Sequence, residues 1–184
     1  MKSHTLAGIG LAAIFALLAP SAPSNADETD FISLFGGSWS GSGIIIKDGT
    51  TRQLSCRATG SPSPNRLTIE GDCSLFIVSV RIAADIAYDP ASGRYTGTYT
   101  GAEVGQALVS GQRDGDLVNL VITWPGPVHG DTLAHMTVSN SGVGNLQILI
   151  SDNVIPGGPE QQTSGLSFGR DGTSRARLVL TDGP

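Results

Sequence analysis

The sequence predicts an all-β protein: an antiparallel up-and-down β-barrel of about eight to eleven strands that begins with a short helical turn. Of 184 residues, 39% are hydrophobic and 15% charged, with 25 Gly and 10 Pro. This composition is too apolar for a disordered chain and too rich in Gly and Pro for a helical bundle. Asp-Gly pairs at 48–49, 114–115 and 171–172 each lie between β-rich runs. Asp-Gly supplies the positive φ that tight hairpin turns need.

Residues 1–26 have the features of a signal peptide. Lys2 gives a basic start, Leu6–Ala19 is apolar without charge, and the small residues Ser24 and Ala26 fit the −3 and −1 positions of a cleavage site. The apolar run is short for a membrane span, so we expect none after cleavage. We therefore expect a single β-barrel domain over residues 27–184, exported to the bacterial periplasm or secreted.

The net charge indicates which partners are disfavoured, and the two cysteines indicate a disulfide bond in an oxidising compartment. The formal charge of −5 becomes −6 once Lys2 leaves with the leader, which disfavours nucleic acid as a partner. Cys56 and Cys73 are the two cysteines of the chain. In an oxidising compartment such a pair predicts a disulfide bond.

The predicted elements follow one another along the chain. Thr29 and Asp30 cap a helical turn at Phe31–Phe35, which Gly36 and Gly37 end. Strands are then expected at Trp39–Lys47, Thr50–Ala58, Arg66–Cys73, Val80–Tyr88, Arg94–Thr100, Gln106–Arg113, Asp116–Trp124, Thr132–Ser139, Asn145–Ser151, Gly165–Gly169 and Arg175–Thr181. Because no helical pattern separates them, a parallel α/β fold is disfavoured. Closing the antiparallel sheet into a barrel hides its edges; a β-sandwich is the alternative.

The segment Phe31–Trp39 resembles the start of calycin barrels, the lipocalins and their relatives, in which a helical turn precedes a Gly-x-Trp. Gly37-Ser38-Trp39 carries the match. The resemblance implies that Trp39 lies at the closed end of a barrel, with an arginine from a late strand, Arg175 or Arg177, across its ring. The chain is also similar to small periplasmic inhibitors of secreted metalloproteases, barrels that begin near a Gly-x-Trp and carry one disulfide.

Patterns typical of enzymes lack their context in this chain. Gly165–Gly169 matches the Gly-x-Ser-x-Gly of a hydrolase nucleophile elbow, but that motif needs a following helix and a later His. His129, His135 and Asp131 do not have the spacing of a metal site. We expect no catalytic residue, no metal and no cofactor, and therefore not an enzyme.

The leading functional hypothesis is a non-enzymatic periplasmic barrel that binds a small apolar or amphipathic ligand. The expected ligand-binding residues are aromatic and have small neighbours, Gly41, Gly43, Gly97 and Ala84, on the same strand faces; they are Trp39, Tyr88, Tyr95 and Tyr99. The alternatives are a protein-binding barrel, such as a periplasmic protease inhibitor, and an envelope structural factor. A protein partner would bind the loops at 125–130 and 152–163.

Overall fold

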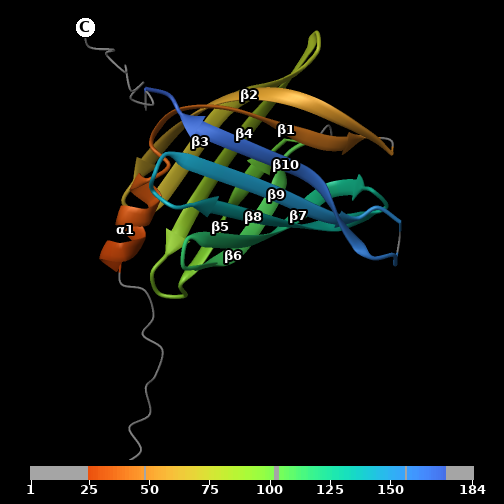
Figure 1. Cartoon of the computed structure of the whole chain (residues 1–184). Helices are drawn as coiled ribbons and strands as arrows, with labels where there is room; N and C mark the ends of the chain where they lie inside the picture. The colour runs from red at the N-terminus through yellow and green to blue at the C-terminus, as the bar shows by residue number, and fades with distance from the viewer. Residues whose placement is uncertain (1–24, 48, 102–103, 156, 173–184) are drawn as a thin grey trace, which may run out of the picture.

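A computed structural model describes residues 25–47, 49–101, 104–155 and 157–172. Within these ranges one helix precedes ten strands (Figure 1). In order they are α1 (Asn25–Ser33), β1 (Gly37–Lys47), β2 (Thr50–Ser63), β3 (Arg66–Leu75), β4 (Val78–Asp89), β5 (Arg94–Thr100), β6 (Ala107–Asp114), β7 (Leu117–Val128), β8 (Asp131–Asn140), β9 (Asn145–Asn153) and β10 (Glu160–Arg170). The strand expected at Arg175–Thr181 lies outside the described residues.

The ten strands form one closed antiparallel barrel in which each strand pairs with the next. The last strand closes the sheet on the first: Trp39 of β1 lies opposite Arg170 of β10 on one side and opposite Ala58 of β2 on the other. The predicted up-and-down barrel is therefore confirmed. The sandwich alternative is wrong, because a closed sheet has no edge to separate two layers.

Several strands are longer than the sequence pattern predicted. The loop expected at 152–163 shrinks to 154–159, because β9 continues to Asn153 and β10 begins at Glu160. Likewise, most of the loop expected at 125–130 belongs to β7. Local turn composition favours loops here, but neighbouring strands of a barrel satisfy the backbone N–H and C=O groups and extend the pairing. In these extended parts the strand register is irregular, between Thr123 and Val128 and between Gln162 and Ser164.

The helix begins earlier than expected, so that Thr29 and Asp30 lie inside it rather than at its cap. Asp27 and Glu28 occupy its first turn, where negative charge is favoured by the helix dipole. The helix covers one end of the barrel (Figure 1). There Thr29 Oγ1 donates to Pro64 O at 3.0 Å, and Asn140 Nδ2 donates to Leu34 O at 3.1 Å.

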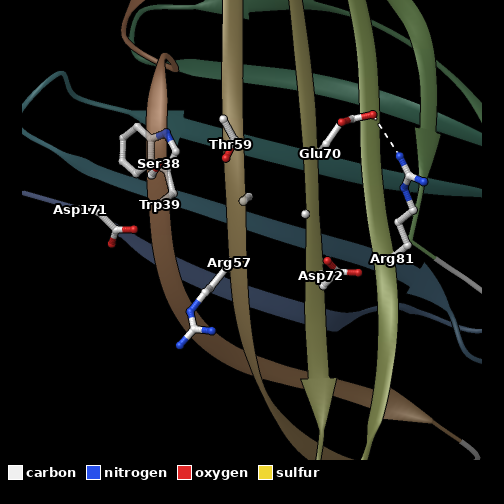
Figure 2. A pocket seen from close by; sticks show the side chains of 10 residues that line it. Ser38, Trp39, Arg57, Thr59, Glu70, Asp72, Arg81 and Asp171 are labelled. Carbon is white, nitrogen blue, oxygen red and sulfur yellow. Dashed lines mark hydrogen bonds and ion pairs between the residues drawn. The ribbon is translucent and has the colours of Figure 1, made fainter.

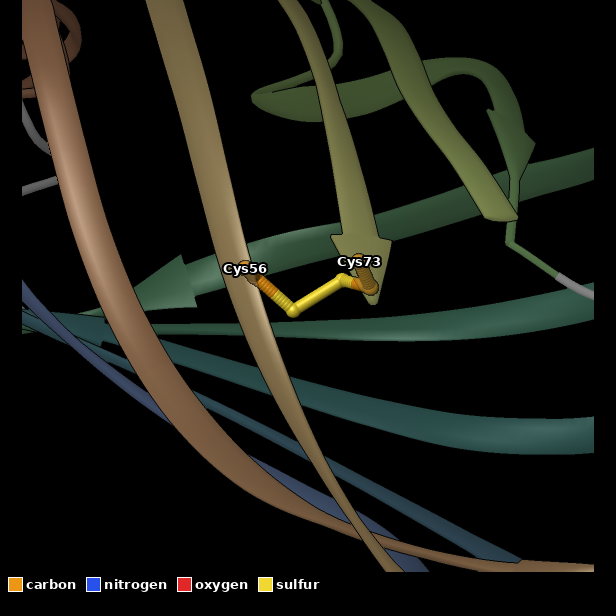
Figure 3. The surroundings of a disulfide bond; sticks show 2 residues. All are labelled: Cys56 and Cys73. Carbon is orange, nitrogen blue, oxygen red and sulfur yellow. A yellow bond between two sulfur atoms is a disulfide. The ribbon is translucent and has the colours of Figure 1, made fainter. Parts of the chain in front are cut away.

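The predicted disulfide is confirmed. Cys56 of β2 and Cys73 of β3 lie directly opposite each other and are bonded (Figure 3). Both residues are buried and belong to the core, which is formed by the inward positions of the strands together with the apolar side of α1. The disulfide therefore joins neighbouring strands from inside the barrel.

Candidate functional site

The two ends of the barrel differ. The β2–β3, β4–β5, β6–β7 and β8–β9 turns lie at the end that α1 covers. The β1–β2, β3–β4, β5–β6, β7–β8 and β9–β10 connections lie at the opposite end, which we call the open end because no helix of the described part of the chain lies over it. A ligand entering the barrel therefore has its shortest route at the open end.

At the closed end, Trp39 is fixed by two contacts. Trp39 is 2% exposed, and its Nε1 donates to Phe35 O at 3.0 Å. The guanidinium of Arg170 lies 4.6 Å from the ring centroid and also donates to the backbone carbonyls of Leu34 and Gly36. The cation over the ring is thus Arg170. Arg175 and Arg177, which the sequence predicted for this place, lie outside the described residues.

Two of the predicted ligand residues, Tyr88 and Tyr95, also lie at the closed end, with their ring centroids 5.2 Å apart. Tyr95 Oη donates to Glu28 Oε1 at 2.5 Å, and Arg113 Nη2 lies 2.7 Å from Glu28 Oε2. Glu28 is fully buried. Burial and the contact with Glu28 raise the pKa of Tyr95, and burial raises that of Tyr88. This cluster ties α1 to the barrel, so the two tyrosines support the closed end.

The fourth predicted residue, Tyr99, lies apart from the other three and against Trp124, with ring centroids 6.0 Å apart. The strand registers give an inward row that alternates large and small side chains across four strands: Trp124 of β7, Ala107 of β6, Tyr99 of β5 and Ala84 of β4. Burial raises the pKa of Tyr99 to about 12. A neutral phenol and an indole therefore line the interior on the open-end side.

Two polar atoms in this region have no hydrogen-bond partner among the residues that the structure describes: Trp124 Nε1 and Asp152 Oδ1. Both residues are buried, with Asp152 only 2% exposed. Asp152 follows Ile148 and Ile150 at the inward positions of β9. The register, continued by one residue, sets Asp152 opposite Ala134 of β8, which pairs with Ile122 of β7, one inward position before Trp124. Strand β8 therefore separates the strands that carry the two groups, and its Ala134 is buried.

The Oδ1 atom of Asp152 is in an unfavourable position, because it is buried and has no partner among the described residues. Burial raises its pKa, opposed by the backbone N–H of Asn153 and by His129. Leaving a buried polar atom unpaired costs about 1–3 kcal/mol. Such atoms are satisfied in proteins by water or by a ligand. The pair of atoms is therefore the chemical feature of the interior that points to an occupant.

The barrel wall is less closely packed along β3 to β5 and at Ile148 of β9. Inward side chains along the barrel wall remain partly exposed although they pack against the core; among them are Ile69, Ile82, Ile86, Tyr99 and Ile148. Midway along the strands of a closed barrel, an inward side chain is reached chiefly from inside. In a barrel of eight strands the side chains just fill the interior. A barrel of ten strands is wider.

Trp124 and Asp152 were missed as site residues by the sequence reasoning. The signal for Trp124 is its place in the alternation of Val118, Leu120 and Ile122, all buried in β7. The signal for Asp152 is an acidic residue at the next inward position after two isoleucines. Alternation gives these orientations. It does not show that the two polar atoms lack partners.

The rejected enzyme and metal patterns have structural explanations. Gly165–Gly169 is an extended part of β10, in which Leu166 and Phe168 are buried and Ser167 is exposed. His135 Nδ1 lies 3.0 Å from Glu160 Oε1 on the outer surface, and His129 occupies the β7–β8 turn with a φ of 54°. Within the described ranges, no group of three or more His, Cys, Asp or Glu side chains is placed to hold a metal ion.

A shallow hollow lies on the outer face of β1 to β4. Figure 2 shows its charged side chains, Arg57, Glu70, Asp72, Arg81 and Asp171. Glu70 and Arg81 form an ion pair at 3.0 Å, but their side chains are 72% and 68% exposed. Exposed pairs of this kind are well solvated and contribute little. The hollow therefore offers no desolvated group for recognition.

Comparison with known proteins supports the fold and nothing finer. No family model matches the sequence, and no curated protein matches it. The chain is similar to the crystal structure of Rv2717c from M. tuberculosis, with a TM-score of 0.60 and 15% identity, over 83% of this chain and 98% of that chain. At this identity the likeness shows the barrel alone. No helix among the described residues is both long and apolar enough to cross a membrane.

Proposed function

We propose that this chain is an exported, non-enzymatic binding protein that holds one small amphipathic molecule inside the barrel, entered from the open end. The observation that carries the proposal is the presence of two buried atoms without a partner among the described residues: Nε1 of Trp124, whose ring lies beside that of Tyr99, and Asp152 Oδ1. Ligand sites are typically apolar cavities with a few convergent polar groups. The partly exposed isoleucines of the wall supply the apolar surface.

The two atoms also define the polar group of the ligand. The indole N–H donates only, and an ionised carboxylate accepts only. A hydroxyl group can accept from Trp124 and donate to Asp152 at the same time. A second carboxylate would repel Asp152. The ligand class is therefore an apolar molecule with a hydroxyl or similar donor–acceptor head, in preference to a fatty acid.

Competition for a neutral apolar dye, Nile red, tests this proposal on the purified protein. We expect saturable dye binding, displaced by a long-chain alcohol at lower concentration than by the fatty acid of the same length. Asp152→Asn and Trp124→Phe should each weaken the alcohol about tenfold, the effect of losing one buried hydrogen bond of about 1.4 kcal/mol. Asp72→Asn, on the exposed face of β3, is the control and should change nothing. Absence of saturable dye binding by the wild type would contradict the proposal.

A further inference from the structure

The tip of the β3–β4 hairpin exposes large apolar side chains to solvent. Phe76 is 92% exposed, Ile77 is 100% exposed and Val78 is 57% exposed. The hairpin projects from the barrel at the top of Figure 1. No charged residue occurs in the stretch Ser74–Val80. Single exposed apolar residues are ordinary, but three in succession at a protruding tip indicate a surface that meets something apolar.

The backbone of this tip is strained as well. Leu75 pairs with Val78, so Phe76 and Ile77 form a two-residue turn. Phe76 has a φ of 55°, a conformation that suits glycine and is unfavourable for a bulky residue. At this position Gly would improve the turn and remove the exposed ring. Phe76 instead adopts this unfavourable conformation, and its exposed ring contributes little packing to the barrel. Such a residue is expected where the side chain contacts another molecule.

Other apolar side chains lie on separate loops at the same end. Val104 of the β5–β6 connection is 39% exposed, and Ile155 of the β9–β10 connection is 64% exposed. Three loops at the open end thus each present an apolar residue. A protein partner needs a continuous matching surface, whereas a lipid surface accepts separate convex loops without shape complementarity.

We propose that the open end docks reversibly on a lipid bilayer, with the tip Phe76–Ile77 inserted among the acyl chains. Insertion desolvates few polar groups, because the hairpin pairing of Leu75 with Val78 satisfies the backbone and Ser74–Val80 is uncharged. The net charge of −5 gives no general attraction to anionic lipids, so a zwitterionic surface is the expected one. This proposal does not depend on the interior ligand.

Co-sedimentation with phosphatidylcholine vesicles tests the docking. The purified chain should bind, and Phe76→Gly with Ile77→Ser should lower the partition coefficient at least tenfold, because two exposed apolar side chains are removed. The glycine fits the φ of 55°, so the double variant should keep the melting temperature of the wild type. Val143→Ser is the matched control, since Val143 is 75% exposed in the β8–β9 turn at the other end.

A second variant locates the tip in the bilayer. Phe76→Trp should gain indole fluorescence that is quenched by lipids with brominated chains, because the new ring enters the acyl region. Absence of vesicle binding by the wild type would overturn the proposal, as would equal binding by the double variant. A concentration-dependent dimer that Phe76→Gly abolishes would overturn it too, by making a second copy the occupant of the tip.

Discussion

Trp39 closes its end of the barrel through its ring and through its N–H group. The ring lies under Arg170, and Nε1 donates to Phe35 O. Trp39→Ala should therefore lower the free energy of unfolding by about 3–5 kcal/mol, the usual cost of removing a buried tryptophan side chain. Urea unfolding measures it. Trp39→Phe keeps a ring under the guanidinium and should cost distinctly less; equal losses for the two variants would show that the ring contact contributes nothing.

The three tyrosines of the chain share one titration property. The pKa of Tyr99 is about 12, and those of Tyr88 and Tyr95 are also raised, in each case mainly by burial. In the unfolded chain tyrosine ionises near pH 10. Between about pH 10 and 12 the folded protein thus binds more protons than the unfolded one, and its stability falls as pH rises.

Absorbance at 295 nm, which reports tyrosinate, measures this shift directly. At pH 10 we expect a much smaller signal from the native protein than from the protein in urea, in which about half of the tyrosine is ionised. Tyr99→Phe should leave the native curve at pH 10 unchanged and should weaken the loss of stability above it. A native tyrosine that titrates near pH 10 would contradict the burial that the structure assigns.

At the scale of elements, helix α1 is held by one buried charge. Glu28 is fully buried and pairs with Arg113, whose side chain is 15% exposed. Breaking a buried ion pair by removing one partner costs about 3–5 kcal/mol, so Glu28→Gln should destabilise the protein by about 3 kcal/mol. Asp30→Asn, on an exposed position of the same helix, should have little effect. Thermal unfolding of the two variants makes the comparison, and similar melting temperatures would remove the anchoring role of Glu28.

The strands could be predicted from local pattern, whereas the contacts between distant elements could not. Asp-Gly turns and alternation place most of β1 to β9 within a few residues of their observed bounds. The partner of Trp39 depends on the register between the first and the last strand, which sets Trp39 opposite Arg170. No local signal fixes a pairing between residues so far apart in sequence.

The candidate site shows the same limit. Tyr99 was predicted from its alternation in β5, and the inward orientation of Asp152 follows from the same rule in β9. Their significance comes from what surrounds them: Tyr99 meets Trp124, and Asp152 Oδ1 meets no donor. Those facts depend on how three non-adjacent strands, β5, β7 and β9, curve around one interior. They became visible only once the barrel was closed.

On the scale of the whole molecule, the barrel has one locked end and one open end. At the closed end a buried ion pair joins α1 to β6, and a cation–aromatic contact joins β1 to β10. At the open end lie the unpartnered interior atoms and the exposed apolar tip. The stabilising contacts thus lie at the closed end and the proposed ligand-binding groups at the open end. A change in the interior near the open end should therefore affect ligand binding more than folding.

Ala84→Leu tests this separation. Ala84 faces inward on β4 opposite Tyr99, in the row of alternating large and small side chains. If the interior is open, the added carbons fill ligand space, so Nile red affinity should fall at least tenfold while the melting temperature changes little. In a solidly packed interior the same change overpacks the core and costs about 1–3 kcal/mol. Ala83→Leu makes the same chemical change on the outer face of β4, opposite Glu70, and should leave dye binding unaltered. A large loss of stability for Ala84→Leu, with Ala83→Leu unaffected, would establish a filled barrel and overturn the ligand hypothesis.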